Sequence, residues 1–162
     1  MKTHFVSILD DFVNFLPIFQ SRIRRDEMRG VNRLYRWQEF PRKEVRQPLD
    51  DCVFCRIVRG EIPSTKVYED AQVLAFHDIT PQAPVHVLIV PKAHTESLVT
   101  AAALDDQLLS HLLRTAAEVA RMLSIDQSGF RVVSNCGAHG CQSVPHLHIH
   151  LLGGKQLSGS MV

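Results

Sequence analysis

Three histidines occupy alternate positions near the C-terminal end of the chain: His146, His148 and His150. On a β-strand, alternate side chains point to the same face, so the three imidazoles would lie together and the intervening aliphatic residues would face the opposite side. A structural role explains one buried histidine but hardly three. A neutral imidazole is both a good nucleophile near neutral pH and a metal ligand, so the pattern indicates either covalent catalysis or a metal site.

A second candidate for chemistry is the pair Cys52-x-x-Cys55. Residues 5–19 contain an apolar stretch, but Asp10 and Asp11 interrupt it and no small-residue cleavage site follows, so we expect no secretory signal peptide. We therefore expect a reducing compartment, where such a cysteine pair more often binds metal or does redox work than forms a disulfide. The alternative is two buried thiols that pack as small hydrophobic groups.

The patterning after residue 50 predicts an antiparallel sheet with one principal helix. Leucine, alanine and valine recur at three- and four-residue spacing over residues 104–123, which predicts the helix. Residues 53–58 are apolar except for Arg56 and are followed by the turn signal of residues 59–63. Predicted strands cover residues 66–69, 73–77, 86–91, 131–135 and 146–152. The fold class is therefore α+β.

Composition supports one globular domain. The 162 residues are 45% hydrophobic and 22% charged, with a formal net charge of +1. No apolar run reaches the roughly 18–20 residues that a membrane-spanning helix needs, so we expect no such span.

Residues 1–48 differ in composition from the rest of the chain. Residues 5–16 show near-helical apolar spacing that Pro17 ends, and residues 21–48 are rich in arginine. We interpret residues 1–48 as a partly flexible extension and residues 49–162 as the domain. Alternatives are an organelle presequence, which the six acidic residues disfavour, or a tether to nucleic acid or acidic lipid. We expect a cytoplasmic protein for which nucleic acid is not the partner, or a mitochondrial or other organellar one if the extension is a presequence.

The residues around the three histidines resemble the histidine-triad (HIT) family, and within it the Hint-like branch of purine nucleoside phosphoramidases. The resemblance covers about residues 50–157. Besides the triad, it rests on Phe54, residues 76–79 (Phe-His-Asp-Ile), residues 81–84 (Pro-Gln-Ala-Pro), His86, residues 91–94 (Pro-Lys-Ala-His), Asn135, residues 142–144 (Gln-Ser-Val) and residues 152–156 (Leu-Gly-Gly-Lys-Gln).

The resemblance implies a role for each matching residue. His148 would be the nucleophile that carries the nucleotidyl group, His86 and His150 would flank the phosphate, and Ser143 would lie near the leaving group. The implied catalytic set is His148, His146, His150, His86 and Ser143. The implied nucleotide-binding set is Phe54, Ile57, Phe76, His77, Asp78, Ile79, Leu88, Asn135, Gln142, Ser143, His148 and His150, with Asp78 on the ribose hydroxyls and Asn135 and Gln142 on the phosphate.

A possible zinc site overlaps the triad. Two ligands beyond Cys52 and Cys55 are available as His94 and His146, an arrangement similar to that of many HIT proteins. Zinc would then be structural, because the chemical step needs no cofactor.

Two functions follow from the resemblance. The leading one is hydrolysis or transfer of a nucleoside monophosphate from a phosphoramidate or related nucleotidyl conjugate. The alternative is a nucleotide-binding regulatory module with weak or irrelevant turnover. The expected partners are a purine nucleotide and a second copy of the chain. The second copy is expected because the apolar stripe of the helix is wider than one small sheet would cover.

The chain also departs from the family pattern. Cys141 stands where glycine is usual, Pro145 where an aromatic residue is common, and the tail lacks a Trp-Pro-Pro ending. Cysteine in place of glycine narrows the backbone conformations available beside the phosphate.

Overall fold

The computed structural model describes residues 50–103 and 105–160. Their elements are α2 (Val53–Val58), β1 (Lys66–Glu69), β2 (Val73–His77), β3 (Val85–Pro91), a 3₁₀ helix (Thr100–Ala103), α3 (Asp106–Met122), β4 (Phe130–Val133) and β5 (Ile149–Gly153). The helix expected within residues 5–16 and the arginine-rich segment lie outside the described residues.

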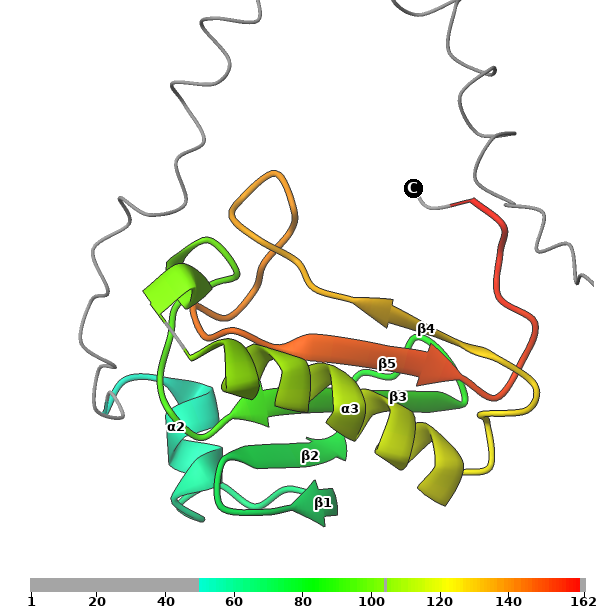
Figure 1. The fold of residues 1–162 in the computed structure, drawn as a ribbon, viewed down its shortest axis with the longest axis horizontal. Helices are drawn as coiled ribbons and strands as arrows, with labels where there is room; N and C mark the ends of the chain where they lie inside the picture. Colours follow the sequence, from blue (N-terminus) through cyan, green and yellow to red (C-terminus); the bar gives the residue numbers. More distant parts are fainter. Residues whose placement is uncertain (1–49, 104, 161–162) are drawn as a thin grey trace, which may run out of the picture. The chain divides into compact units, whose positions relative to one another are not determined.

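The five strands form one antiparallel sheet in the order β1-β2-β3-β5-β4 (Figure 1). The central strand β3 pairs with β2 on one side and with β5 on the other, with Leu88 opposite His150. The α+β prediction is confirmed, and the two edge strands are β1 and β4.

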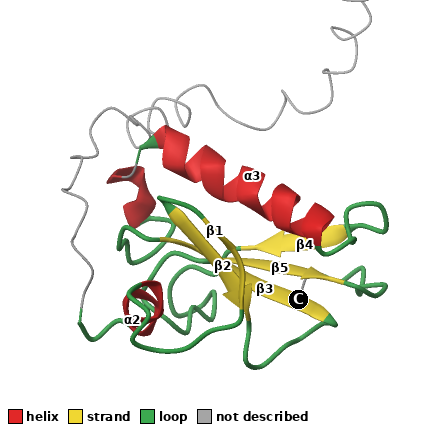
Figure 2. Cartoon of the chain, turned by 90° about the horizontal axis from the view of Figure 1, so that it is seen from below, coloured by secondary structure: helices red, strands yellow, loops and turns green. Residues whose placement is uncertain are grey.

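The two helices pack on opposite faces of the sheet (Figure 2). On one face, α3 covers a core that includes Val87 and Ile89 of β3 and Leu151 of β5. On the other face, α2 packs against a second core that includes Leu88 and Val90. Alternate residues of β3 therefore serve the two cores, as the two-residue period of a strand requires.

Helix α3 lies within the predicted range. Asp105 caps it, since its side chain accepts a hydrogen bond from the Gln107 backbone N–H at 3.0 Å. Its buried residues include Leu108, Leu112 and Val119, so part of the predicted apolar stripe meets the sheet, while Leu113 of the same stripe is exposed. Among the described residues, no helix is long and apolar enough to cross a membrane.

The last strand is shorter than predicted. We expected a strand over residues 146–152, but β5 begins at Ile149, and residues 146–148 precede it without ladder pairing. Likewise, β4 ends at Val133, and the prediction extended it to residue 135. The histidines still alternate with buried aliphatic residues, since Leu147 and Ile149 join the core under α3. Other contacts must therefore hold the segment that carries His146 and His148.

Candidate active site and metal centre

A cavity of about 640 Å³ opens on the α2 side of the sheet. It is mostly apolar, with a few polar side chains along its wall, which is typical of a small-molecule site. Eight residues predicted from sequence line it: Phe54, Ile57, Phe76, His77, Asp78, Ile79, Leu88 and Ser143.

Sequence reasoning missed six lining residues: Val53, Ile62, Pro63, Ser64, Thr65 and Val144. Most of them follow the turn at Gly60, where the sequence shows only a loop. Their position in the wall depends on how this loop runs back to β1, and no local pattern signals it.

Phe54 of α2 joins the cavity to the triad. Its ring lies edge-on to those of His148 and Phe76, with centroid separations of 5.3 and 5.8 Å. Aromatic rings at this separation and angle attract each other. His148 thus lies against a ring that lines the cavity, although His148 is not itself a lining residue.

The proton of the His148 ring is placed by the backbone. Its Nδ1 lies 2.7 Å from the carbonyl oxygen of His146, which can only accept a hydrogen bond, so Nδ1 carries the hydrogen. In the neutral ring, Nε2 then keeps its lone pair. His148 is buried at 2% exposure, and this tautomer is the one that nucleophilic attack through Nε2 requires.

A second hydrogen-bonded chain sets the tautomer of His150. The backbone N–H of Gln82 donates to His86 Nδ1 at 3.2 Å, which leaves the His86 proton on Nε2. The Nε2–H of His86 faces His150 Nδ1 at 2.8 Å, so the His150 proton lies on Nε2. His150 Nε2 is buried and has no hydrogen-bond partner among the described residues. His150 therefore offers an unused N–H donor, suited to an anionic oxygen.

Burial keeps these rings neutral. Burial, together with the neighbouring His148 and His86, lowers the pKa of His150 to about 4 against an opposing effect of Asp78. Burial also lowers the pKa of His86, against an opposing effect of Asp78. Both rings are thus uncharged near neutral pH, so His150 offers its Nε2–H as a neutral hydrogen-bond donor and not as a cation.

Asp78, His86 and His150 also offer three ligand atoms close enough to hold a metal ion. The Gln82 contact disfavours this use. With Nδ1 of His86 already accepting a hydrogen bond, Nε2 carries the proton, and a protonated nitrogen cannot ligate a metal. His86 Nε2 also lies 3.5 Å from Asp78 Oδ2, while Asp78 Oδ1 accepts from the Thr80 N–H at 2.7 Å.

Gln142 braces the loop before the triad. Its Oε1 accepts from the Gly137 N–H at 3.0 Å, and its Nε2 donates to the carbonyls of Glu96 and Val144 at 2.6 and 2.9 Å. The side-chain amide is thus engaged with backbone, and a direct phosphate contact by it stays a prediction. Ser143 is exposed at the cavity, and Asn135 is half-buried and does not line it.

Cys141 takes the conformation that favours glycine, with φ of 56°. The Cys141 N–H bonds to the Ala138 carbonyl and the Gln142 N–H to the Gly137 carbonyl, a pair of bonds that closes the turn around a left-handed residue. The left-handed conformation strains cysteine by about 1 kcal/mol relative to glycine. The loop therefore keeps the backbone shape that glycine would provide.

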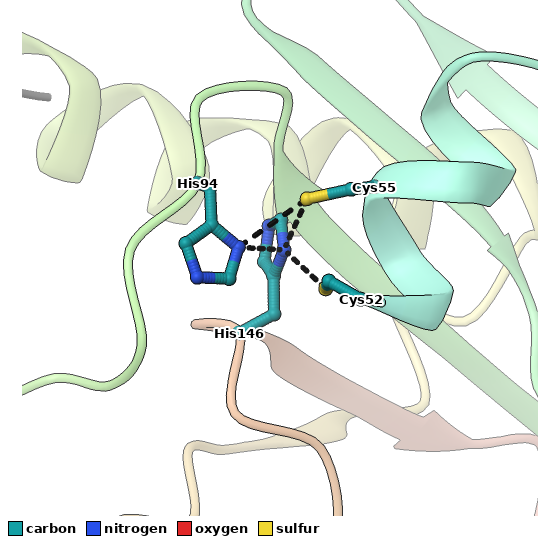
Figure 3. Close-up of side chains that lie close together, drawn as sticks. All are labelled: Cys52, Cys55, His94 and His146. Carbon is teal, nitrogen blue, oxygen red and sulfur yellow. Dashed lines mark hydrogen bonds between the residues drawn. The ribbon is translucent and has the colours of Figure 1, made fainter. Parts of the chain in front are cut away.

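The four predicted metal ligands converge in one buried cluster (Figure 3). Cys52 and Cys55 come from the N-terminal end of α2, His94 from the loop after β3, and His146 from the segment before β5. His146 Nδ1 lies 3.4 Å from Cys52 Sγ, 3.6 Å from Cys55 Sγ and 3.2 Å from His94 Nδ1. Cys55 Sγ lies 3.3 Å from His94 Nδ1.

These distances fit a tetrahedral ion. Tetrahedral zinc with its usual bond lengths separates two nitrogen ligands by about 3.4 Å and a nitrogen from a sulfur by about 3.6 Å. The His146 ring is also prepared to ligate, since its Nε2–H donates to the Pro91 carbonyl at 2.9 Å and leaves the Nδ1 lone pair facing the cluster. Burial lowers the pKa of His146 to about 4, which keeps that lone pair free. The donor set therefore suits zinc.

The HIT domain family matches residues 59–157 of this chain. A 14 kDa zinc-binding protein from Brassica juncea is 50% identical over 110 residues, which cover 67% of this chain and 96% of that protein. The crystal structure of a HIT family hydrolase from Legionella pneumophila is 44% identical, with a TM-score of 0.66 over 67% of this chain and 97% of that one. A histidine triad nucleotide-binding protein from Candida albicans is 34% identical, with a TM-score of 0.58 over 69% and 87%. The chain belongs to the HIT family.

Proposed function

We propose that this protein is a nucleotide hydrolase or transferase that cleaves purine nucleoside phosphoramidates or related nucleotidyl conjugates through a covalent intermediate on His148. The observation that carries the proposal is the fixed tautomer of His148, whose Nδ1 is bonded to the His146 carbonyl beside the cavity. The sequence relationship adds support, since relatives of this chain are described as a hydrolase and as a nucleotide-binding protein.

In the first step, the Nε2 lone pair of His148 attacks the phosphorus. The bond from phosphorus to the leaving nitrogen breaks, and the amine departs with that electron pair and with a proton taken from solvent. In the second step, water adds to phosphorus, the bond to Nε2 breaks and the water returns a proton to solvent. Nucleoside monophosphate is released and neutral His148 is restored, so atoms and charge balance without a cofactor.

The surrounding groups have separate tasks. The N–H of His150 would donate to a phosphoryl oxygen, where negative charge grows in the transition state. Asp78 would accept from the ribose hydroxyls, and the apolar wall formed by Phe54, Phe76 and Leu88 would hold the purine. Ser143, exposed at the cavity, would contact the leaving group.

The test is turnover of adenosine phosphoramidate by the wild-type protein and by His148→Ala, together with AMP binding by calorimetry. We expect turnover by the wild type, none by the variant, and AMP dissociation constants within about tenfold of each other, because the substitution removes the covalent step and not the base and ribose contacts. Binding without turnover in the wild type would favour the regulatory module instead.

We also propose that Cys52, Cys55, His94 and His146 hold a structural zinc ion. The distances and the His146 tautomer support this set, and a relative is described as zinc-binding. A bound zinc would neutralise the thiolates and join α2 to the two segments that carry the histidines. The phosphorus chemistry needs no step at this ion.

We further propose a homodimer formed through β4 and α3. Edge strand β4 exposes Phe130 and Val132 at 37% and 38%, and α3 exposes Leu113 and Met122 at 58% and 52%. An edge strand with apolar residues and free backbone groups is a template for pairing with another strand. A two-fold partner would extend the sheet and cover these side chains.

A further inference from the structure

The segment that carries the nucleophile is not part of the sheet. β5 pairs with β3 from Ile149 onward and with β4 from His150 onward, so residues 146–148 have no strand partner. Contacts other than strand pairing hold this segment. The Leu147 N–H donates to the Thr95 carbonyl at 2.6 Å, the Ser134 hydroxyl donates to the His148 carbonyl at 3.1 Å, and the ring of His146 lies in the Cys/His cluster.

His146 takes part in both sites at once. Its ring is fully buried, with Nδ1 facing Cys52, Cys55 and His94 and Nε2 bonded to the Pro91 carbonyl. Its own carbonyl accepts the Nδ1–H of His148. A shift of the His146 ring therefore moves the group that fixes the nucleophile's tautomer.

The second ligand-bearing loop acts on the same segment. His94 lies next to Thr95, whose carbonyl holds Leu147 between the two histidines. An ion that pulls His94 and His146 together thus also sets the distance between the Thr95 carbonyl and Leu147.

From these contacts we propose that the Cys52/Cys55/His94/His146 cluster, when it holds a metal ion, fixes the position and tautomer of His148. His146 is then a positioning residue of the reaction, and it acts through its backbone carbonyl. The inference rests on the proposed role of His148 as nucleophile. It assigns the cluster a part in catalysis beyond stabilising the fold, although no substrate atom touches the ion.

The first test compares the metal-loaded and the chelated full-length protein by ¹⁵N NMR of the histidine rings. In the loaded protein we expect His148 to be protonated on Nδ1 with a free Nε2, and in the chelated protein a mixture of both tautomers. The same tautomer ratio in both forms would overturn the proposal. This readout does not depend on turnover.

The second test uses variants of His94, which does not line the cavity. For His94→Asn we expect kcat to fall by about 10–100-fold, the range typical of residues that support a metal site. AMP affinity should stay within about threefold, and His94→Cys, which keeps a zinc ligand, should restore most of kcat. The matched control is Asp70→Asn, which removes half-buried hydrogen bonds at the turn between β1 and β2 and should lower stability without changing kcat.

A cadmium-loaded protein keeps the proposal testable if the metal-free protein unfolds. Cadmium has longer ligand bonds than zinc, so it should displace His146 in a folded protein. We expect a change in kcat of at least about threefold and a shifted His148 ¹⁵N resonance, with unchanged AMP binding. Unchanged kcat and resonance would show that the cluster only stabilises the fold. If loaded wild type shows no turnover and no adduct on His148, the proposed function has failed, whereas the tautomer comparison still decides the coupling.

Discussion

His148 Nδ1 lies 2.7 Å from the carbonyl oxygen of His146, two residues earlier in the chain. Because the acceptor is a backbone atom, the tautomer of His148 depends on the local chain conformation and not on a carboxylate partner. The backbone N–H of Gln82 likewise fixes the tautomer of His86, and His86 in turn fixes that of His150. Two backbone groups thus leave a lone pair on Nε2 of His148 and a hydrogen on Nε2 of His150.

The lowered pKa of His150 predicts how the ring titrates. Burial and the neighbouring imidazoles hold the pKa at about 4, so the ring should stay neutral from pH 8 down to about pH 5. An NMR titration of the His150 Cε1–H resonance should show no midpoint in this range. A midpoint near the ordinary histidine value of about 6.5 would mean that the ring is solvated.

The same shift predicts a stability effect. The pKa in the folded state lies below the unfolded value of about 6.5, so the unfolded chain binds more protons between these two values. The stabilisation from neutral His150 is therefore present above about pH 6.5 and is lost as the pH falls toward 4. His150→Gln should make the free energy of unfolding less dependent on pH in this window, as measured by urea denaturation.

The metal cluster predicts about one zinc ion per chain in protein purified without chelators or a histidine tag. Chelation should lower the melting temperature, because the ion joins segments distant in sequence. Cys55→Ser should lose the zinc, while Cys136→Ser, whose thiol lies outside the cluster, should keep it. Elemental analysis without zinc in the wild type would count against the site.

Asp70 stabilises the turn between β1 and β2 and its contact with α3. Burial alone would raise the pKa of Asp70, but hydrogen bonds from the Gln72 N–H, the Tyr68 hydroxyl, the Val73 N–H and His111 lower it well below its usual range. We expect Asp70→Asn to lower the free energy of unfolding at pH 7 by about 1–3 kcal/mol.

The pH dependence of this effect has a definite sign. The pKa of Asp70 is lower in the folded state, so its stabilisation is complete above the unfolded value of about 3.9 and is lost as the pH falls below it. The difference between wild type and variant should therefore shrink below pH 4. Glu118→Gln, which removes an exposed ion pair with Arg121, is the control and should change stability by less than about 1 kcal/mol.

The proposed dimer predicts that Val132→Arg on β4 yields monomers at micromolar concentration in light scattering. Leu98→Arg changes a similarly exposed residue on the loop after β3 and should leave the dimer intact. A chain that begins at Leu49 should also remain dimeric and active. A shortened chain that aggregates or loses activity would show that the extension is structural and that the domain boundary is misplaced.

Much of the fold was predictable because the patterns are local. Strands β1 and β2 have their predicted bounds, and α3 lies within its predicted stripe. The start of β5 was not predictable from alternation alone. Residues 146–148 alternate as a strand does. They are held by side-chain and loop contacts, however, and not by pairing with a neighbouring strand.

The candidate site was likewise predictable only in part. The resemblance named the residues of the Cys/His cluster, whose ligand atoms lie within 4.8 Å of one another, and eight of the cavity's lining residues. It did not reveal that the Gln142 amide is engaged with backbone, or that Gln82 sets the His86 tautomer, because both depend on backbone groups that carry no sequence signal.

Trapping of the nucleotidyl adduct tests the central claim most directly. Full-length protein mixed with adenosine phosphoramidate, quenched rapidly at alkaline pH to preserve an acid-labile bond and digested with trypsin should yield the peptide of residues 132–155 with one added adenylyl group. Fragmentation should place that group on His148, and His148→Ala should yield only the unmodified peptide. An adduct on another residue, or turnover by a clean His148→Ala preparation, would contradict the account.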